Sequence, residues 1–308
     1  MGAVASPGGR PPEPPADSAG RLRVAIIGTG NIGTDLMFKV ERSPRLELAG
    51  VAGIDPSSAG MRLAREHGHA VSETGLAGLL EMVPRIDLAF DATSARTHAE
   101  HAKLLAERGI RSVDLTPAAI GPAIVPPVNL AAYPDAREVN LVTCGAQATV
   151  PIVAAVRRLA ELPYAETVST VASRSAGPGT RNNIDEFTTA TARSLEQIGG
   201  AAQAKAIIIL NPAEPPIRMR NTIYLDIGDR ISLDALTRAV MEAAADVAAY
   251  VPGYRLAAAP QLAGGVATVM VEVEGAADFL PAFAGNLDIM TSAAVRVAEL
   301  YAAAEDAR

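Results

Sequence analysis

Several residue types that mark particular classes of protein are scarce in this chain. It has one cysteine, Cys144, no tryptophan, and only 4% aromatic residues. A single cysteine excludes an intramolecular disulfide framework and a zinc site of clustered cysteines, and it fits a reducing compartment. Few aromatic rings and a net charge of −7 provide neither stacking platforms nor a basic surface for nucleic acid. We therefore expect no disulfide scaffold and no nucleic-acid partner.

The chain also lacks a long uncharged apolar run. None approaches the ~18 residues that a membrane-spanning helix needs. The first 20 residues are rich in proline and have no apolar stretch of the kind found in a secretory signal. Residues 1–20 are therefore predicted to be a disordered arm, and we expect a cytoplasmic protein without a membrane partner.

What is present indicates two domains of the α/β class. The 308 residues, 49% of them apolar, are enough for two cores. From residue 21, short β-branched runs alternate with segments of helical periodicity, which is typical of βαβ units and a parallel sheet. Beyond Cys144 the alternation is less regular, which predicts an α+β domain with a mixed or antiparallel sheet. The expected division is an arm over 1–20, a first domain over 21–143, a second over 144–285, and a last helix over 286–308 that packs back on the first.

The pattern also places the individual elements. Strands are expected at 22–27, 46–54, 87–92, 111–115 and 138–143, with helices at 34–42, 61–67 and 97–108. In the second domain, strands are expected at 166–174, 206–210, 222–227 and 266–274, with helices at 150–162, 184–198, 232–250 and 286–304.

A glycine-rich motif follows the first expected strand. Residues 28–33, GTGNIG, match GxGxxG and lead directly into a helix. In that context Gly28 permits a tight turn, Gly30 lets a pyrophosphate approach the backbone, and Gly33 allows close packing of helix on strand. The N–H groups at the helix start would face the anion. This predicts a Rossmann dinucleotide-binding domain, and the alternative is a glycine-rich turn without a ligand.

An acidic residue lies at the expected distance beyond this motif. Asp55 follows the second expected strand and precedes Pro56. A carboxylate here would accept hydrogen bonds from a ribose diol and repel a 2′-phosphate, which favours NAD over NADP. The alternative is an aspartate that opens a turn before proline.

Cys144 lies between an expected strand and the lead-in to a helix. N–H groups at a helix start stabilise a thiolate, so we expect the pKa of Cys144 to be lowered, with Gly145 leaving space beside it. The alternative is a buried structural cysteine. Because ligands in α/β folds bind at the carboxyl ends of strands, position favours a nucleophile.

All four histidines precede Cys144. His98 and His101 lie three apart on one expected helix and share a face, as do residues on many solvated helix surfaces. Two ligands do not make a metal site, so a solvated face is the prediction and no metal is expected. The sequence does not support a Cys–His pair.

A second glycine loop, 175–183, joins a strand to a helix and suits either a close ligand or an ordinary connection.

Six segments of the chain together resemble the acetylating acetaldehyde dehydrogenases of meta-cleavage pathways. The matching stretches are GTGNIGTDLM (28–37), DLTPAAIGPAIVPPVNL (114–130), VNLVTCGAQATVPIVAAV (139–156), SAGPGTRNNIDEFT (175–188), KAIIILNPAEPP (205–216) and GNLDIMT (285–291). The resemblance runs from about residue 21 to the C-terminus.

The resemblance implies a Rossmann NAD-binding domain followed by a catalytic and dimerisation domain. It implies oxidation of a short aldehyde, acetaldehyde or propionaldehyde, with NAD and coenzyme A through an acyl thioester on Cys144, in the catabolism of aromatic or steroid compounds. The implied partner is a 4-hydroxy-2-oxoacid aldolase, with a homodimer of this chain inside a heterotetramer. The NAD-binding residues that it implies are Thr29, Gly30, Asn31, Ile32, Ser175, Ala176, Gly177, Pro178, Gly179, Thr180, Arg181, Asn182, Asn183 and Asn286.

One departure from the family concerns proton transfer. Family members often carry aspartate where this chain has Asn221, and a neutral amide cannot take up a proton. Two other functions remain open. A phosphorylating semialdehyde dehydrogenase shares the two-domain plan, but it normally pairs its cysteine with a later histidine. A non-catalytic NAD-binding partner subunit is the other.

Overall fold

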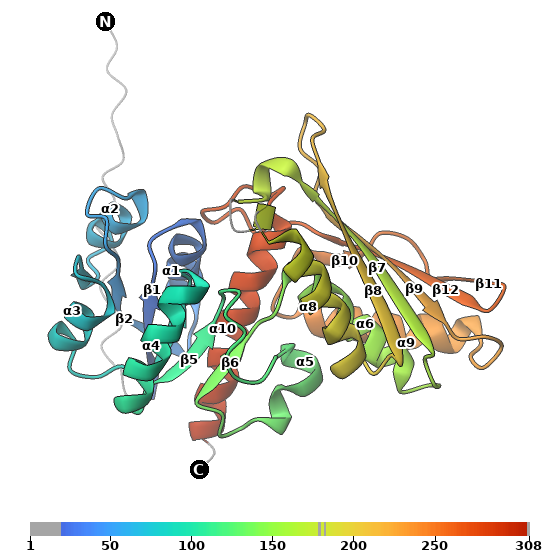
Figure 1. The fold of residues 1–308 in the computed structure, drawn as a ribbon, viewed down its shortest axis with the longest axis horizontal. Coiled ribbons are helices and arrows are strands. Elements are labelled where there is room, and N and C mark those ends of the chain that lie inside the picture. Colours follow the sequence, from blue (N-terminus) through green and yellow to red (C-terminus); the bar gives the residue numbers. More distant parts are fainter. Residues whose placement is uncertain (1–19, 178–179, 182, 307–308) are drawn as a thin grey trace, which may run out of the picture.

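Two sheets lie side by side in the computed structural model, which describes residues 20–177, 180–181 and 183–306 (Figure 1). Residues 1–19 of the predicted arm lie outside the described residues. The first sheet is entirely parallel and the second is mixed. The predicted α/β class, with a Rossmann sheet followed by an α+β unit, is therefore confirmed. No helix in the described part of the chain is long and apolar enough to cross a bilayer.

The first sheet has the strand order β3-β2-β1-β4-β5-β6. Because β1 is central and the order reverses between β1 and β4, the carboxyl ends of these two strands form the switch point at which ligands bind in such sheets. The strands are β1 (Leu22–Ile27), β2 (Leu46–Ala52), β3 (Val71–Ser72), β4 (Leu88–Asp91), β5 (Arg111–Asp114) and β6 (Glu138–Asn140).

Alternation along β1 builds a core on each face of this sheet. Val24 and Ile26 pack toward α1 and α10, whereas Ala25 and Ile27 pack toward α3 and α4. Both faces are covered, so the strand is apolar without a polar face. The helices are α1 (Asn31–Arg42), α2 (Ala59–Glu66), α3 (Gly75–Met82), α4 (Ala95–Glu107) and α5 (Pro126–Asn129), with a 3₁₀ turn at Leu130–Ala132.

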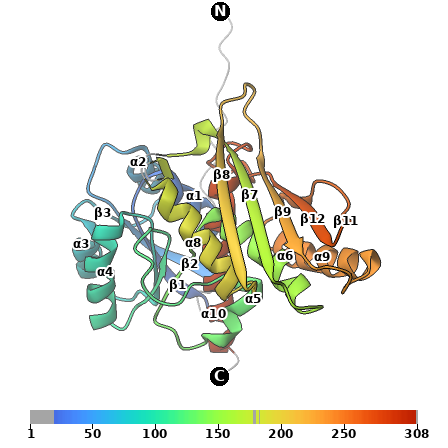
Figure 2. The same cartoon turned by 45° about the vertical axis from the view of Figure 1, so that its right-hand side comes forward.

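The last helix, α10 (Gly285–Asp306), lies between the two sheets (Figures 1 and 2). Its buried small residues, among them Ala293, Ala294 and Ala298, belong to the core of the first sheet. The same helix also contacts α6 and β12 of the second unit. Helix α10 thus packs against the first sheet and α1, while the division of the chain at residue 144 stays a prediction.

The second sheet has the order β10-β12-β9-β7-β8, with β11 paired to β12. Strands β7 and β8 are parallel and joined through α8, and the other pairs are antiparallel. Along β9 the residues alternate between buried and exposed, so one face of the sheet is covered and the other open. Helix α6 contacts both α8 and α9 on the covered face. The elements are α6 (Cys144–Arg157), β7 (Tyr164–Ala172), a 3₁₀ turn (Ser173–Ser175), α8 (Ile184–Gln197), β8 (Gln203–Asn211), β9 (Met219–Asp226), α9 (Leu233–Ala248), β10 (Tyr254–Leu256), β11 (Gln261–Ala263) and β12 (Val266–Val273).

Candidate active site

The GxGxxG residues form the turn between β1 and α1. Gly28 has φ +109°, and a Cβ on Gly33 would lie 1.9 Å from the carbonyl oxygen of Gly28. Neither position can carry a side chain without moving the backbone. A Cβ on Gly30, by contrast, would meet nothing within 4 Å. Two of the glycines therefore close the turn, and the third keeps the space over the helix start clear.

The start of α1 is open to an anion. Gly30 is its N-cap, no side chain caps it, and the first turn has no acidic residue. Its free N–H groups and the positive end of the helix dipole can thus meet a pyrophosphate. Asn31 is exposed and Ile32 is partly buried beside this turn, and the Thr29 hydroxyl lies 3.0 Å from that of Ser58. The cradle fits the phosphates of a dinucleotide.

Asp55 lies exposed just beyond β2. Its carboxylate accepts hydrogen bonds from the backbone N–H and hydroxyl of Ser57, at 2.9 and 2.6 Å, and these lower its pKa. Asp55 therefore opens a turn around Pro56, the structural alternative considered from the sequence. Its contact with a ribose stays a prediction.

The second glycine loop meets the start of α10. The side-chain amide of Asn286 donates to the carbonyl of Ser175 over 3.3 Å, and the buried Oδ1 of Asn286 has no partner in the described part of the chain. Arg181 donates to the carbonyls of Ser173 and Ala176, at 2.7 and 3.0 Å, which fixes the entry to the loop. The orphaned oxygen of Asn286 is free for a ligand donor. Pro178, Gly179 and Asn182 lie outside the described residues, whereas Gly177, Thr180 and Asn183 lie within them.

Cys144 is the first residue of α6, so the helix begins six residues before the predicted start at residue 150. The hydroxyl of Thr143 caps it by accepting from the N–H of Ala146 at 3.0 Å. The Thr191 hydroxyl donates to the carbonyl of Phe187, so it accepts from Thr143 over 2.7 Å. Neither Thr143 nor Thr191 was predicted from the sequence as a site residue, although threonine before a helix is a recognisable cap signal.

The chain turns sharply before Cys144. Strand β6 ends at Asn140, three residues earlier than predicted, and the Asn140 side chain accepts from the N–H of Val142 at 3.2 Å. Val142 has φ +58°, which is rare for a β-branched residue and occurs mainly at functional sites. Buried Gln147 donates to the carbonyl of Leu141 at 2.9 Å. These contacts hold the turn that presents Cys144.

Two expectations about the cysteine are wrong. Burial raises the pKa of the Cys144 thiol to about 12, outweighing the backbone N–H of Gly145, which acts to lower it. Gly145 also leaves no open space, because a Cβ on it would lie 3.0 to 3.3 Å from Phe187, Ser169 and Thr191. The glycine lets α6 approach β7 and α8. In the ligand-free protein, Cys144 is therefore a neutral thiol.

A buried polar pair lies under the start of α6. Ser169 on β7 stands opposite Asn221 on β9, and both are almost completely buried. The Ser169 hydroxyl and both polar atoms of the Asn221 side chain have no partner among the described residues. Unsatisfied buried polar groups cost about 1–3 kcal/mol each, and each deserves a functional explanation. Asn221 can donate or accept a hydrogen bond there, but it cannot act as a base.

His98 and His101 were predicted to share a solvated helix face. For His98 this prediction is wrong. His98 is completely buried and lies 2.9 Å from Asp91, 2.8 Å from Glu138 and 3.5 Å from Asp114. Burial alone would lower its pKa, but the hydrogen bond to Asp91 and the charges of Asp114 and Asp91 raise it to about 9. His101 also contacts Asp91, at 2.7 Å. Because Asp91 and Asp114 end neighbouring strands, the sequence carried a signal for this cluster.

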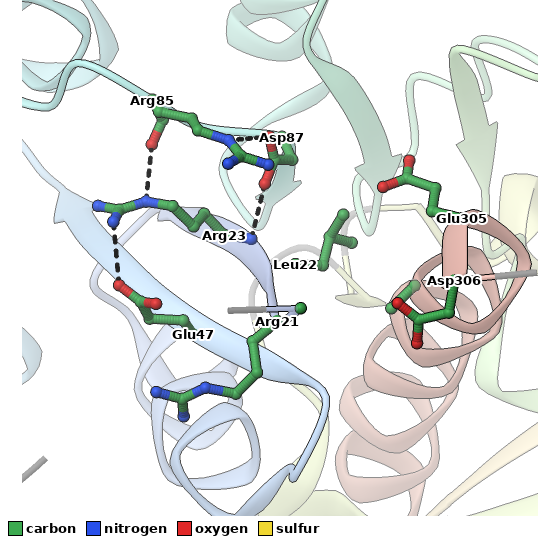
Figure 3. A pocket seen from close by; sticks show the side chains of 10 residues that line it. Arg21, Leu22, Arg23, Glu47, Arg85, Asp87, Glu305 and Asp306 are labelled. Carbon is green, nitrogen blue, oxygen red and sulfur yellow. Dashed lines mark hydrogen bonds and ion pairs between the residues drawn. The ribbon is translucent and has the colours of Figure 1, made fainter. Parts of the chain in front are cut away.

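The pocket in Figure 3 is separate from these residues. It has a volume of about 320 Å³ and lies beside the amino ends of β1 and β2 and the end of α10. Arg23 pairs with Glu47 at 3.1 Å and its backbone N–H donates to Asp87 at 2.9 Å, while Arg85 also pairs with Asp87 (Figure 3). Ligands of parallel sheets bind at the carboxyl ends of the strands, so this ionic pocket is not the candidate active site.

Comparison with known proteins agrees with this architecture. Residues 23–136 match the model of the semialdehyde dehydrogenase NAD-binding domain, which supports NAD as cofactor. Residues 144–281 match the model described as prokaryotic acetaldehyde dehydrogenase, dimerisation, which supports a homodimer.

Individual relatives match over nearly their whole length. The acetaldehyde dehydrogenase of Geobacillus stearothermophilus is 56% identical over 280 residues, covering 91% of this chain and 95% of that protein. The acetaldehyde dehydrogenase of Chloroflexus aggregans is 57% identical over 293 residues, covering 92% and 96%. Aspartate semialdehyde dehydrogenase II of Vibrio cholerae, solved as a complex with ASA, shares the fold with a TM-score of 0.64 at 15% identity, over 91% of this chain and 98% of that one. This chain therefore belongs to the prokaryotic acetaldehyde dehydrogenase family and is an NAD-dependent aldehyde dehydrogenase.

Proposed function

We propose that the protein converts a short aldehyde, NAD and coenzyme A to acyl-CoA and NADH through a thioester on Cys144. The observation that carries this proposal is the position of the thiol. Cys144 is the first residue of α6, after a strained turn at the edge of the parallel sheet, and it is partly exposed.

Cysteine suits both halves of such a reaction. In the first half the thiol adds to the aldehyde carbonyl, so that a C–S bond forms, and the thiol proton reaches the carbonyl oxygen or solvent. When bound, NAD would accept the hydride from the former aldehyde carbon, and any proton on its oxygen would be released to solvent, which leaves an acyl thioester on Cys144. In the second half the thiol of coenzyme A attacks the thioester carbon, and Cys144 leaves as a thiol. A serine ester would be more stable and would transfer its acyl group poorly.

The residues around the thiol have complementary tasks in this proposal. The free N–H groups of α1 and the open space above Gly30 would hold the pyrophosphate, and Asn286 with the loop that begins at Ser175 would hold another part of NAD. Asn221 would hydrogen-bond rather than take a proton. Burial raises the pKa of the Cys144 thiol to about 12, so in this proposal the thiol loses its proton as substrate or cofactor binds.

The acyl acceptor is the decisive test. NADH formation is measured with acetaldehyde and NAD in the presence of coenzyme A, of phosphate, or of neither. Turnover that requires coenzyme A supports the proposal, and phosphate-dependent turnover would instead identify a phosphorylating enzyme. No histidine follows Cys144 in the sequence, which favours the first outcome. Cys144→Ser should abolish CoA-dependent NADH formation, and near-normal turnover by that variant would overturn the assignment.

The preferred aldehyde needs its own measurement. Acetaldehyde and propionaldehyde differ by one methylene, which a pocket discriminates by about 1–3 kcal/mol. Steady-state kinetics with a C2–C4 aldehyde series would rank them by kcat/KM.

The family resemblance also underlies the proposed assembly. We place the protein in the catabolism of aromatic or steroid compounds, in a complex with a 4-hydroxy-2-oxoacid aldolase. Co-expression of the two chains, followed by size-exclusion chromatography with light scattering, tests this. A heterotetramer is expected, and separate elution of the dehydrogenase at every concentration would count against it.

A further inference from the structure

Two imidazoles and one carboxylate converge on the outside of the first unit, away from the residues discussed above. Glu41 lies in the last turn of α1, His67 is the C-cap residue of α2, and His69 follows two residues later. One oxygen of Glu41, Oε1, lies 2.8 Å from Nδ1 of His67 and 2.6 Å from Nε2 of His69. The ligand atoms of the three residues all lie within 4.8 Å of one another.

Packing fixes the geometry of this cluster. The ring of Phe38 meets His67 edge-on with 5.2 Å between centroids and stacks on Phe279 at 6.2 Å. The N–H of His69 donates to the carbonyl of Ala64 at 3.0 Å, and Gly68 between the histidines has φ +82°. The His67 ring and the backbone of His69 are therefore held by contacts that do not depend on Glu41.

The arrangement has the donor set of a transition-metal site. Two imidazole nitrogens point at one position, the Glu41 oxygen, and a small shift of that flexible side chain would let an ion occupy the space between the three groups. Imidazole suits Zn²⁺, Ni²⁺ and Cu²⁺, and three protein ligands with an open fourth position are typical of zinc sites that also bind water. The side chains are 27% (Glu41), 33% (His67) and 18% (His69) exposed, so an ion has access from solvent.

A second cluster of three carboxylates provides an informative contrast. Asp35, Asp278 and Asp288 also lie close together, but the ammonium group of Lys39 sits among them at 3.2, 3.3 and 2.7 Å. That position already holds a cation. At Glu41, neither of the described neighbours is a permanent cation, since His67 and His69 become charged only on protonation.

We propose that Glu41, His67 and His69 form a binding site for a divalent transition metal such as Zn²⁺. The ion would link the end of α1 to the turn after α2. At about 1.5 Å per residue, Glu41 lies about 15 Å along α1 from the dinucleotide turn at Asn31. This distance places the site outside the dinucleotide turn, and we assign it no part in the reaction at Cys144.

Zinc binding to the tag-free, EDTA-treated chain tests the proposal. Because Cys144 can itself bind zinc, isothermal titration is carried out with the wild-type protein and with Cys144→Ser as the parent for further changes. One Zn²⁺ per chain is expected in the parent. His67→Gln, His69→Gln and Glu41→Gln should each weaken binding by at least about 10- to 100-fold, the loss seen when even a residue outside the metal ligands is removed. Glu66→Gln, an exposed glutamate on α2 nearby, should bind as the parent does.

Thermal unfolding supplies a second readout that does not depend on the activity. Saturating Zn²⁺ should raise the Tm of the parent and of Glu66→Gln by a few degrees, and should leave that of His69→Gln unchanged. Absence of saturable binding, or equal affinity in the parent and the three ligand variants, would overturn the proposal. Circular dichroism checks that each variant is folded.

Discussion

The ammonium group of Lys39 lies 2.7 Å from a carboxylate oxygen of Asp288, although 249 residues separate them in the chain. Both side chains are buried in the contact between α1 and α10. Asp35, on the same helix as Lys39, accepts a hydrogen bond from Thr291 of α10 at 2.6 Å. The helix that starts at the dinucleotide turn is thereby held against the helix that starts beside Asn286.

Lys39→Met should destabilise the protein strongly. Removal of the buried cation leaves Asp35 and Asp288 without a counterion and leaves Asp278 with Arg42 alone. Breaking a buried pair costs about 3–5 kcal/mol. Burial alone would lower the pKa of Lys39, but the charges of Asp288 and Asp35 raise it, so the residue is protonated at neutral pH. The matched control is Arg42→Met, because Arg42 also contacts Asp278 but its side chain is 57% exposed. Urea unfolding should show a loss within about 1 kcal/mol for that control, and equal losses in both variants would contradict the role given to Lys39.

Two glycines of the dinucleotide turn should respond differently to alanine. Gly33→Ala places a Cβ 1.9 Å from the carbonyl oxygen of Gly28, so the turn must move and both stability and NAD affinity should fall. Gly30→Ala meets no atom within 4 Å and has an ordinary φ of −78°, so its free energy of unfolding should change by about 1 kcal/mol or less. Its methyl group would nevertheless occupy the approach of the pyrophosphate. Equilibrium unfolding together with NAD titration separates the two effects, and unchanged NAD affinity in Gly30→Ala would place the pyrophosphate elsewhere.

The pH dependence of alkylation should report the environment of Cys144. Since burial raises the pKa of the thiol to about 12, the rate of its reaction with iodoacetamide in the ligand-free protein should rise continuously between pH 7 and 10. Because this is the only cysteine, mass spectrometry of the intact chain follows the reaction directly. A plateau below pH 8 would show that the thiol is already ionised, as the helix position alone had suggested.

The hydroxyl group of Thr143 should contribute both to the stability of the protein and to its kcat. Thr143→Val keeps the shape but removes both the cap of α6 and the hydrogen bond to Thr191, and loss of a cap costs about 0.5–2 kcal/mol. Displacement of the helix start should also reduce kcat more than it changes KM for the aldehyde. Thr143→Ser retains the hydroxyl and is the matched control. Kinetics and urea unfolding of both variants measure these effects, and equal behaviour would exclude a role for the hydroxyl.

His98 should make stability depend on pH in the alkaline range. Its pKa is about 9 in the folded protein and near 6.5 in the unfolded chain, so its contribution is complete below pH 6.5 and is lost as the pH rises through 9. The groups that face it are Asp91, Asp114, Glu138 and, through Asp91, His101. The expected decrease in the free energy of unfolding is of the order of 3 kcal/mol.

The control for this effect is His98→Gln, which should lack most of the decrease between pH 6.5 and 9. The thiol of Cys144 remains in both proteins and contributes to the loss above about pH 8.5, so the comparison isolates the histidine. The carboxyl group of Asp91 affects the free energy of unfolding at acidic rather than alkaline pH. Hydrogen bonds from His101 and His98 lower its pKa despite burial, so its contribution is lost only in acid. If the free energy of unfolding of the wild-type protein and of His98→Gln changed with pH in the same way, His98 would not be the titrating group.

The sequence pattern predicted the elements better than their ends. Strand β1 was predicted over the residues at which it occurs, because a β-branched run stopped by Gly28 is a local signal. Helix α6 was predicted six residues too short at its start, because the cap formed by Thr143 was not recognised and Pro151 lies inside the helix. Strand β3 has two residues, and strands β10 and β11 of the second sheet have three each. Strands this short show no periodicity, so the sequence pattern did not predict them.

The sequence by itself determined the features that depend on neighbouring residues: the glycine turn, the helix after it, and the single thiol between a strand and a helix. Backbone conformation at Gly28 and Gly33 is a local requirement, so spacing is enough to reveal it. Only the tertiary structure decided that Asn286 meets Ser175, that Lys39 meets Asp288, and that burial keeps the Cys144 thiol protonated. These properties depend on the charged groups and the packing that segments distant in the sequence bring together. A local sequence pattern therefore does not predict them. The one cysteine, whose scarcity excluded disulfides and cysteine zinc sites, owes its chemistry to that packing.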